Sequence, residues 1–251
     1  MACWWTDCEI LNSMTMKKIR SIVLAGLIVA GCTIAPKTQN VKFSGALRTM
    51  MSGNLEATIS LDSLSRKSHL YALGAFENLK GEIQIFDGEA FNTSVDSNEV
   101  SFDRSFNEKA ALLVYAEVTS WQSKAIPTEI NTLNELEEFI EKRAKQSGLS
   151  MEKPFPFLIT GKVDSLQWHV IDWVEGDTLH THQKHQESGL NGTLKDRDIE
   201  IIGFFSKSHK AVFTHHTRFV HMHFKDKYEE IAGHVDELRL GSNMELKLPK
   251  I

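Results

Sequence analysis

Short apolar runs that end at turn-forming residues dominate the sequence after residue 50. Each run is bounded by Gly, Asn, Asp or Pro, and most are rich in β-branched or aromatic residues, a pattern typical of β-strands. The chain is therefore predicted to be mostly sheet. The predicted strands are residues 55–60, 82–86, 111–118, 157–160, 168–173 and 199–205.

One segment has a helical pattern instead. Thr132 and Glu135 have the spacing of a capping box at a helix start, and Gly148 ends the pattern. Between them, apolar residues recur at helical spacing: Leu133, Leu136, Phe139, Ile140 and Ala144. Few helices among many strands predict the α+β fold class, with mixed or antiparallel β-sheets in two layers or halves.

Two prolines, Pro154 and Pro156, interrupt the chain just after this helix. They divide the folded body into a predicted amino-terminal half at 41–150 and a predicted carboxy-terminal half at 151–251. The second half contains most of the histidines of the chain.

The amino-terminal residues have the pattern of a targeting signal. Lys17, Lys18 and Arg20 precede an apolar stretch at 22–29, and a run of small residues then ends in Cys32. The apolar stretch is well below the roughly 20 residues of a membrane-spanning helix. The segment resembles a bacterial lipoprotein signal peptide, in which the cysteine is acylated and becomes the new amino terminus.

On this interpretation, residues 1–31 are a leader and signal peptide, with Met16 as a second start, and residues 32–40 are a polar tether. The folded body is then predicted to lie in the bacterial cell envelope, anchored to the membrane by the lipid on Cys32, on the periplasmic or the outer surface. A plain secretory signal and an uncleaved anchor are the alternatives, and both also place the body outside the cytoplasm.

Charge and cysteine content limit the chemistry of the folded body. Lys and Arg number 28 against 33 Asp and Glu, so the formal net charge is −5 and no basic field attracts a nucleic acid. Because the cysteines are Cys3, Cys8 and Cys32, the body after residue 32 has no disulfide, no thiolate metal site and no cysteine nucleophile. Any metal site there must use histidines and carboxylates.

Two histidines alternate along a predicted strand at residues 218–224. Strand periodicity places Phe219, His221 and His223 on one face. After a polar stretch the chain can return as an antiparallel strand and bring His234 beside the pair. Three imidazoles with an open fourth position suit a catalytic zinc, and nitrogen ligands also suit copper, nickel or iron. The alternative is a pair of hydrogen-bonded or solvent-facing strand histidines.

A second group of histidines has no apolar alternation around it. The segment is predicted to be a solvated loop with incidental histidines, with surface metal binding as the alternative; the three are His180, His182 and His185. His215 and His216 are predicted to lie near the mouth of the metal site. Adjacent residues of a strand point to opposite faces, so only one of these two can face it.

Four segments of the sequence resemble the α-acetolactate decarboxylase family: residues 45–57, 73–88, 221–223 and 233–235. The similarity extends over most of the folded body, and the separations of the three histidines agree with the zinc-binding pattern of the family.

This resemblance implies that His221, His223 and His234 are zinc ligands. It implies in addition that Glu82 is a catalytic carboxylate that approaches the metal from the amino-terminal half. The implied activity is the conversion of acetolactate, a small 2-hydroxy-3-keto acid, to acetoin and carbon dioxide.

Three features depart from the family pattern. Ala75 replaces a threonine, Leu158 replaces an arginine, and the sequence ends at Ile251, before the stretch that carries the family's second glutamate. Because arginine binds carboxylates in a bidentate way, its loss is expected to weaken substrate binding unless Lys162 or another cation replaces it. These departures favour the alternative of a non-catalytic or repurposed lipoprotein that binds metal or a small molecule, whereas Glu82 favours the enzyme.

Overall fold

The computed structural model describes residues 40–251 of the chain. The predicted signal peptide, the predicted lipidation site Cys32 and all but the last residue of the predicted tether lie outside these residues. Within residues 40–251, no helix is long and apolar enough to cross a membrane.

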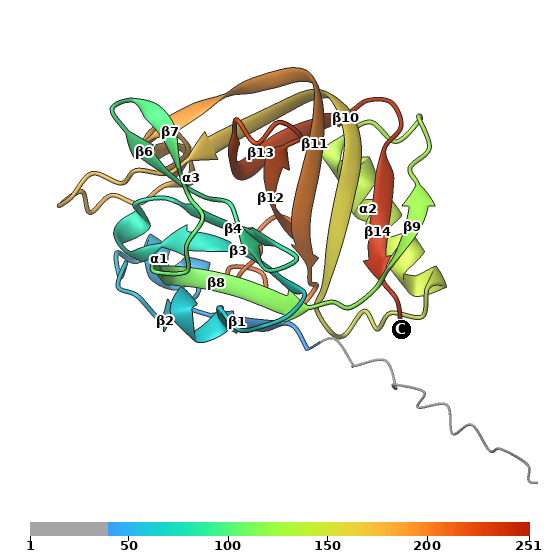
Figure 1. Ribbon diagram of the computed structural model, residues 1–251, viewed down its shortest axis with the longest axis horizontal. Helices are drawn as coiled ribbons and strands as arrows, with labels where there is room; N and C mark the ends of the chain where they lie inside the picture. The colour runs from blue at the N-terminus through green and yellow to red at the C-terminus, as the bar shows by residue number, and fades with distance from the viewer. Residues whose placement is uncertain (1–39) are drawn as a thin grey trace, which may run out of the picture. The chain divides into compact units, whose positions relative to one another are not determined.

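The first sheet is antiparallel throughout and has the strand order β1-β8-β3-β4-β6-β7, with β2 beside β8 and β5 beside β4 (Figure 1). Short helical segments lie in its connections: α1 (Leu47–Met51), η1 (Leu61–Leu64) and η2 (Glu77–Leu79). The strands are β1 (Lys42–Ser44), β2 (Ile59–Ser60), β3 (Leu70–Phe76), β4 (Glu82–Phe86), β5 (Glu89–Ala90), β6 (Asn92–Asp96), β7 (Glu99–Asp103) and β8 (Lys109–Glu117).

The second sheet is also antiparallel and has the order β11-β12-β13-β10-β14-β9. Because β11 pairs with β10 as well as with β12, the strands β10 to β13 close into a ring. Its elements are β9 (Trp121–Ala125), α2 (Leu133–Gln146), β10 (Phe155–Val170), α3 (His182–Glu187), β11 (Leu190–Phe205), β12 (Val220–Asp226), β13 (Ala232–Leu240) and β14 (Glu245–Pro249).

The first sheet is buried on both faces near its centre, where every residue of β3 is buried. Leu70 and Ala72 pack on the outer face beneath η1. Their neighbours Tyr71 and Leu73 pack on the inner face, in the same apolar cluster as Ile202 of β11. The two sheets therefore meet face to face across an apolar core, as expected for the inner faces of a layered fold.

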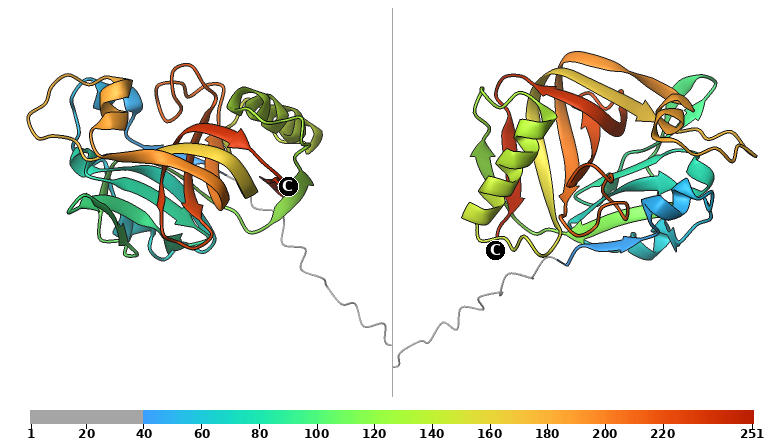
Figure 2. Two further views of the ribbon diagram at one scale, coloured as in Figure 1. Left: turned by 90° about the horizontal axis from the view of Figure 1, so that it is seen from above. Right: turned by 180° about the vertical axis from the view of Figure 1, so that it is seen from behind.

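The predicted helix is confirmed as α2. The Thr132 side chain accepts a hydrogen bond from the Glu135 backbone N–H, and the Glu135 carboxylate accepts one from the Thr132 N–H. This capping box satisfies two N–H groups that have no partner within the helix. The apolar face of α2 packs on the second sheet (Figure 2). The predicted α+β class, with antiparallel sheets in two layers and few helices, is confirmed as well.

Three of the predicted strands differ from the structure. Only Ile59 and Ser60 of the predicted strand 55–60 form a strand. The runs 157–160 and 168–173 belong largely to one long strand, β10, which ends at Val170. Register shifts of β10 against β13 interrupt the strict alternation between these runs, so the sequence pattern breaks although the strand continues.

The chain passes from the first sheet to the second between β8 and β9, because β9 pairs with β14. β9 and α2 therefore belong with the second sheet although they precede residue 150. The division into halves at 41–150 and 151–251 stays a prediction about domains. The described residues form one compact unit.

Candidate metal centre

Three predicted histidines converge from two neighbouring strands. β12 presents His221 and His223 on one face, while Val220, Met222 and Phe224 pack into the core on the other. His223 lies directly opposite His234 of β13 in the strand register. Phe219 differs from the prediction: β12 begins only at Val220, and Phe219 packs against the core of the opposite face.

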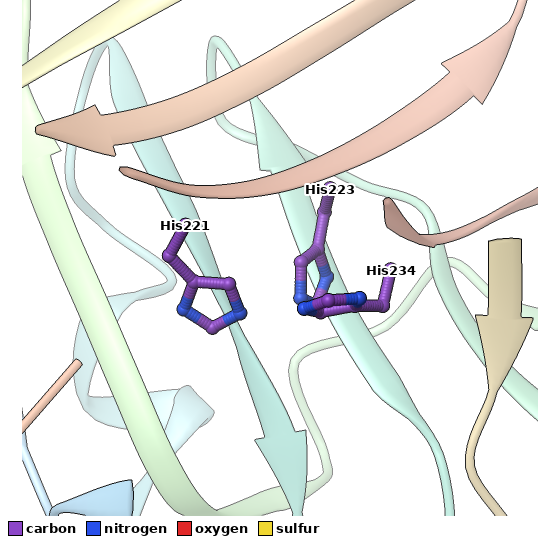
Figure 3. Close-up of side chains that lie close together, drawn as sticks. All are labelled: His221, His223 and His234. Carbon is purple, nitrogen blue, oxygen red and sulfur yellow. The ribbon is translucent and has the colours of Figure 1, made fainter. Parts of the chain in front are cut away.

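The nitrogen atoms of these histidines lie close enough to share one ion. One ligand atom from each of His221, His223 and His234 lies within 4.8 Å of those of the other two. The ring centroids are 5.1 to 5.2 Å apart, and the rings face a common centre (Figure 3). The sequence thus correctly predicted which imidazoles meet.

The nitrogens of the three histidines divide into partnered and unpartnered atoms. His223 Nδ1 lies 3.1 Å from Gln84 Oε1, and His234 Nδ1 lies 3.2 Å from Asp236 Oδ1. In contrast, His221 Nδ1 and His223 Nε2 are buried without a hydrogen-bond partner. Buried polar atoms normally have hydrogen-bond partners. The two unpartnered nitrogens are therefore suited to bind a metal ion.

Burial keeps these imidazoles neutral. It lowers the pKa of His221 and His223 well below the ordinary value, and the neighbouring histidines act in the same direction. Burial also lowers the pKa of His234, although its hydrogen bond with Asp236 opposes the shift. A neutral imidazole has a lone pair for a metal, so the three residues fit a divalent transition ion.

Glu82 reaches the histidines from the other sheet. Its Oε2 lies 3.7 Å from His223 Nε2, and its Oε1 lies 3.6 Å from His169 Nε2 and accepts a hydrogen bond from the Ile171 N–H at 3.3 Å. Burial raises the pKa of the Glu82 carboxyl well above the usual range, and the nearby Asp236 carboxylate adds to the rise. Glu82 is therefore a carboxyl that holds its proton to an unusually high pH.

The backbone before Glu82 explains this position. Gly81 has a φ of +156°, and a Cβ at this residue would lie 2.2 Å from the Thr93 carbonyl oxygen of β6. Only glycine lets β4 begin this close to β6. Glu82, the first residue of β4, is then directed into the space between the sheets.

These residues line one cavity of about 330 Å³. Its polar wall includes the three histidines, Glu82, His169 and Asp236, and its apolar wall includes Leu79, Leu112 and Ile171. Among the described residues that line the cavity, Arg218 is the one with a Lys or Arg side chain.

Comparison with known proteins identifies the family. A model of a family described as alpha-acetolactate decarboxylase matches residues 43–251. The chain belongs to this family. No curated protein matched the sequence.

Solved structures share the fold of this chain at low sequence identity. The alpha-acetolactate decarboxylase of Bacillus subtilis strain 168 has a TM-score of 0.68 and 16% identity, with 84% of this chain and 86% of that chain covered. A protein of unknown function from Staphylococcus aureus, similar to alpha-acetolactate decarboxylase, has a TM-score of 0.67 and 16% identity, with 84% and 85% covered.

The sequence patterns did not indicate several polar residues of this decarboxylase-family site, among them Gln84, His169 and Asp236. Gln84 follows Glu82 by two residues on β4, and Asp236 follows His234 by two on β13. The same strand alternation that was applied to His221 and His223 could have found both. His169 of β10 lies opposite His234 in the register, a pairing that no local pattern reveals.

The prediction of a solvated loop around residues 180–185 is wrong for residues 182–185, which belong to a short helix, although none of its residues is buried. Thr181 caps a short helix, α3, by accepting a hydrogen bond from the Lys184 N–H. His182 and His185 both line the cavity, as does His215. A helix of this length has too few residues for a periodic apolar face, which is why the sequence pattern did not indicate it.

The positions that depart from the family pattern are apolar here. Ala75 lines the cavity, and Leu158 of β10 is buried in the apolar cluster between the sheets, outside the residues that line the cavity. Lys162, considered as a replacement cation, lies 3.7 Å from Asp196 Oδ1 in an exposed ion pair and does not line the cavity either. Arg218 is the cation that the structure offers instead.

Proposed function

We propose that the protein is a zinc-dependent decarboxylase that converts 2-acetolactate to acetoin and carbon dioxide. The observation that supports this best is the meeting of Glu82 with His221, His223 and His234 in one cavity. Three histidine ligands with an open position suit zinc, and other divalent transition metals accept the same ligands. The cavity volume of about 330 Å³ is suited to a small substrate.

The reaction needs an electron sink and a proton. The bond between C2 and the carboxylate carbon breaks, carbon dioxide leaves, and the electron pair moves toward the neighbouring ketone oxygen. When bound, a divalent ion supplies the Lewis acidity that polarises the ketone and hydroxyl oxygens. One proton must then reach carbon to give acetoin.

Glu82 is suited to deliver this proton. Its burial keeps the carboxyl protonated to a higher pH than usual, as the raised pKa indicates. A positioned acid near its working pH is the usual device for such a transfer. The hydrogen bond from the Ile171 N–H holds one carboxyl oxygen, which orients the group toward the histidines.

Arg218 is proposed to bind the substrate carboxylate. One terminal nitrogen donates to Asn134 Oδ1 at 2.7 Å, and the other lies 3.4 Å from Glu237 Oε1. These contacts fix the guanidinium while using two of its five N–H groups. A guanidinium of this kind binds carboxylates in a bidentate way.

Arg218→Gln is therefore expected to raise KM for acetolactate about tenfold or more, the scale of a lost charge-assisted hydrogen bond, with a smaller change in kcat. Inhibition by acetoin, which has no carboxylate, should stay unchanged. Arg239→Gln on the exposed side of β13 is the control. An unchanged KM in Arg218→Gln would exclude this role.

Binding without turnover is the second candidate function. Ala75 makes the cavity wall less polar than the family pattern, and three neutral histidines would bind a metal without Glu82. The test is product formation: a decarboxylase loaded with zinc releases acetoin and carbon dioxide from acetolactate in equal amounts. A binding protein takes up the metal and releases neither.

We further propose that Cys32 is acylated and anchors the protein in the bacterial cell envelope. This rests on the charged, apolar and small-residue order of residues 16–32. Metabolic labelling with a fatty acid is expected to tag the wild type, and Cys32→Ala should lose the label and accumulate an unprocessed form. A labelled Cys32→Ala variant, or a wild type found in the cytoplasmic fraction, would contradict the proposal.

A further inference from the structure

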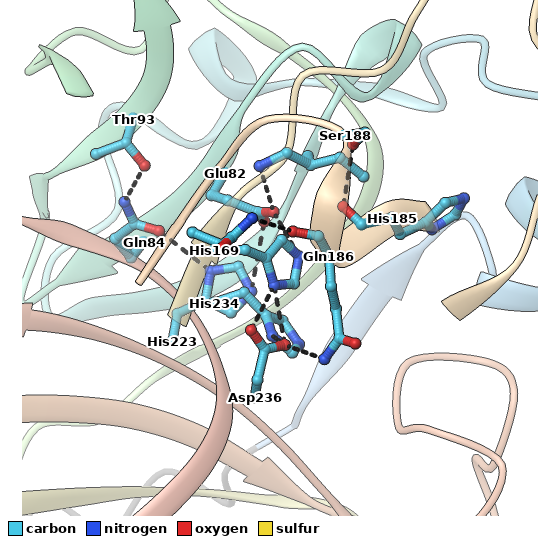
Figure 4. A network of polar contacts seen from close by, with 12 residues as sticks. Glu82, Gln84, Thr93, His169, His185, Gln186, Ser188, His223, His234 and Asp236 are labelled. Atoms are coloured by element: carbon cyan, nitrogen blue, oxygen red, sulfur yellow. Dashed lines mark hydrogen bonds and ion pairs between the residues drawn. The ribbon is translucent and has the colours of Figure 1, made fainter. Parts of the chain in front are cut away.

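The Asp236 carboxylate accepts hydrogen bonds from three side chains (Figure 4). His169 Nδ1 lies 2.9 and 3.0 Å from its two oxygens, and His234 Nδ1 lies 3.2 Å from Oδ1. Gln186 of α3 donates from Nε2 to the same Oδ1 at 2.8 Å. The side chain of Asp236 is only 7% exposed, so water does not readily replace these contacts.

These contacts determine the tautomer of both histidines. As a carboxylate, Asp236 can only accept hydrogen bonds, and its Oδ1 already accepts one from the Gln186 side-chain amide. Each Nδ1 must therefore carry a hydrogen, and in a neutral ring Nε2 then has the lone pair. For His234 this is the nitrogen left for a metal, and for His169 it is the atom 3.6 Å from Glu82 Oε1.

The same residues form a second group that could hold an ion: His169, His234 and Asp236. An ion at this group would have to displace the hydrogen bonds that both Nδ1 atoms make to Asp236. The other group has unpartnered buried nitrogens on His221 and His223 and requires no such loss. The structure therefore favours the three histidines as the ligands and Asp236 as their support.

We propose that Asp236 is a positioning residue that orients two imidazoles at once, His234 toward the metal and His169 toward Glu82. This rests on the metal binding in the proposed function. An outer carboxylate on a ligand histidine commonly raises metal affinity about 10- to 100-fold. Here the same carboxylate also links the ligand to the proposed acid, and Gln186 connects it to the helix α3 at the cavity wall.

The test compares Asp236→Asn with Asp196→Asn, a change of the same kind at an exposed carboxylate that pairs with Lys162. Zinc affinity is measured by competition with a chelator. We expect Asp236→Asn to lose about 10- to 100-fold in affinity and Asp196→Asn to match the wild type. His169→Gln should stay close to the wild type, because it removes only the branch that leads to Glu82.

A second measurement determines the tautomers of His169 and His234 directly. Long-range ¹H–¹⁵N NMR of the metal-free wild type should show His169 and His234 with hydrogen on Nδ1, and Asp236→Asn should shift both rings to mixed tautomers. Hydrogen on Nε2 at either ring of the wild type would overturn the proposal even if Asp236→Asn failed to fold. So would a zinc affinity in Asp236→Asn within about twofold of the wild type. A wild type that holds no zinc would instead overturn the proposed function, and the tautomers would still decide the role of Asp236.

Discussion

His223→Ala is expected to remove nearly all bound metal from the protein. His223 is 1% exposed, its Nε2 has no hydrogen-bond partner, and the chain places it directly opposite His234. With two remaining ligands, an open site binds a first-row ion about a hundredfold or more weakly. The wild type should hold about one divalent ion per chain by elemental analysis, and His221→Ala and His234→Ala should behave like His223→Ala.

The matched control is His69→Ala, because His69 is an exposed histidine that pairs with Asp87 and does not line the cavity. It should keep the metal content of the wild type. If the triple variant of His221, His223 and His234 kept that content as well, the site would lie elsewhere. The histidines of the 180–185 segment would then be the first to examine.

Glu82→Gln is expected to lower turnover by roughly a hundredfold or more, the usual scale for a positioned acid-base group. Gln keeps the shape and can still accept the Ile171 hydrogen bond, but it has no acidic proton to deliver. Metal content should stay near that of the wild type because the three histidines are unchanged. Unchanged turnover in Glu82→Gln would remove this residue from the mechanism.

The same variant provides a check that does not depend on activity. Because the pKa of Glu82 is raised on folding, the folded state keeps a proton that the unfolded chain releases above the ordinary value of 4.5. The stability that Glu82 contributes is thus fully present below that pH and is lost as pH rises through the folded pKa. Gln lacks this dependence.

In the metal-free protein, the free energy of unfolding of Glu82→Gln should therefore increase relative to that of the wild type as pH rises. The increase is at most about 1.4 kcal/mol per pH unit. Denaturant unfolding at several pH values measures this difference. The exposed Glu89→Gln serves as the control. A difference that stays constant between about pH 4 and pH 8 would show that Glu82 is not the buried acid described here.

Local patterns predicted those parts of the fold and site that depend on residues close in sequence. The capping box and apolar spacing of α2 are contained within one segment, and the alternation of His221 and His223 lies within one strand. The position of His234 could be predicted because its strand follows β12 after a short connection. Each of these interactions is decided by neighbours that the sequence places a few residues apart.

The remaining site residues depend on strand pairing over long separations. His169 reaches His234 through the register of β10 against β13, and Glu82 reaches His223 only because the two sheets pack together. Arg218 precedes β12 and lines the cavity, and its guanidinium contacts Asn134 and Glu237. No periodicity in the sequence encodes such distances, so placing His169, Glu82 and Arg218 at the site required the structure.

Product formation from racemic acetolactate tests whether Glu82 and the three histidines catalyse a decarboxylation. Zinc-loaded protein should release acetoin and carbon dioxide in equal amounts, at a rate that His223→Ala removes and Glu82→Gln lowers by roughly a hundredfold. A wild type that holds zinc yet releases neither product across pH and with other divalent metals would contradict the account. The protein would then be a metal-binding or small-molecule-binding member of the family.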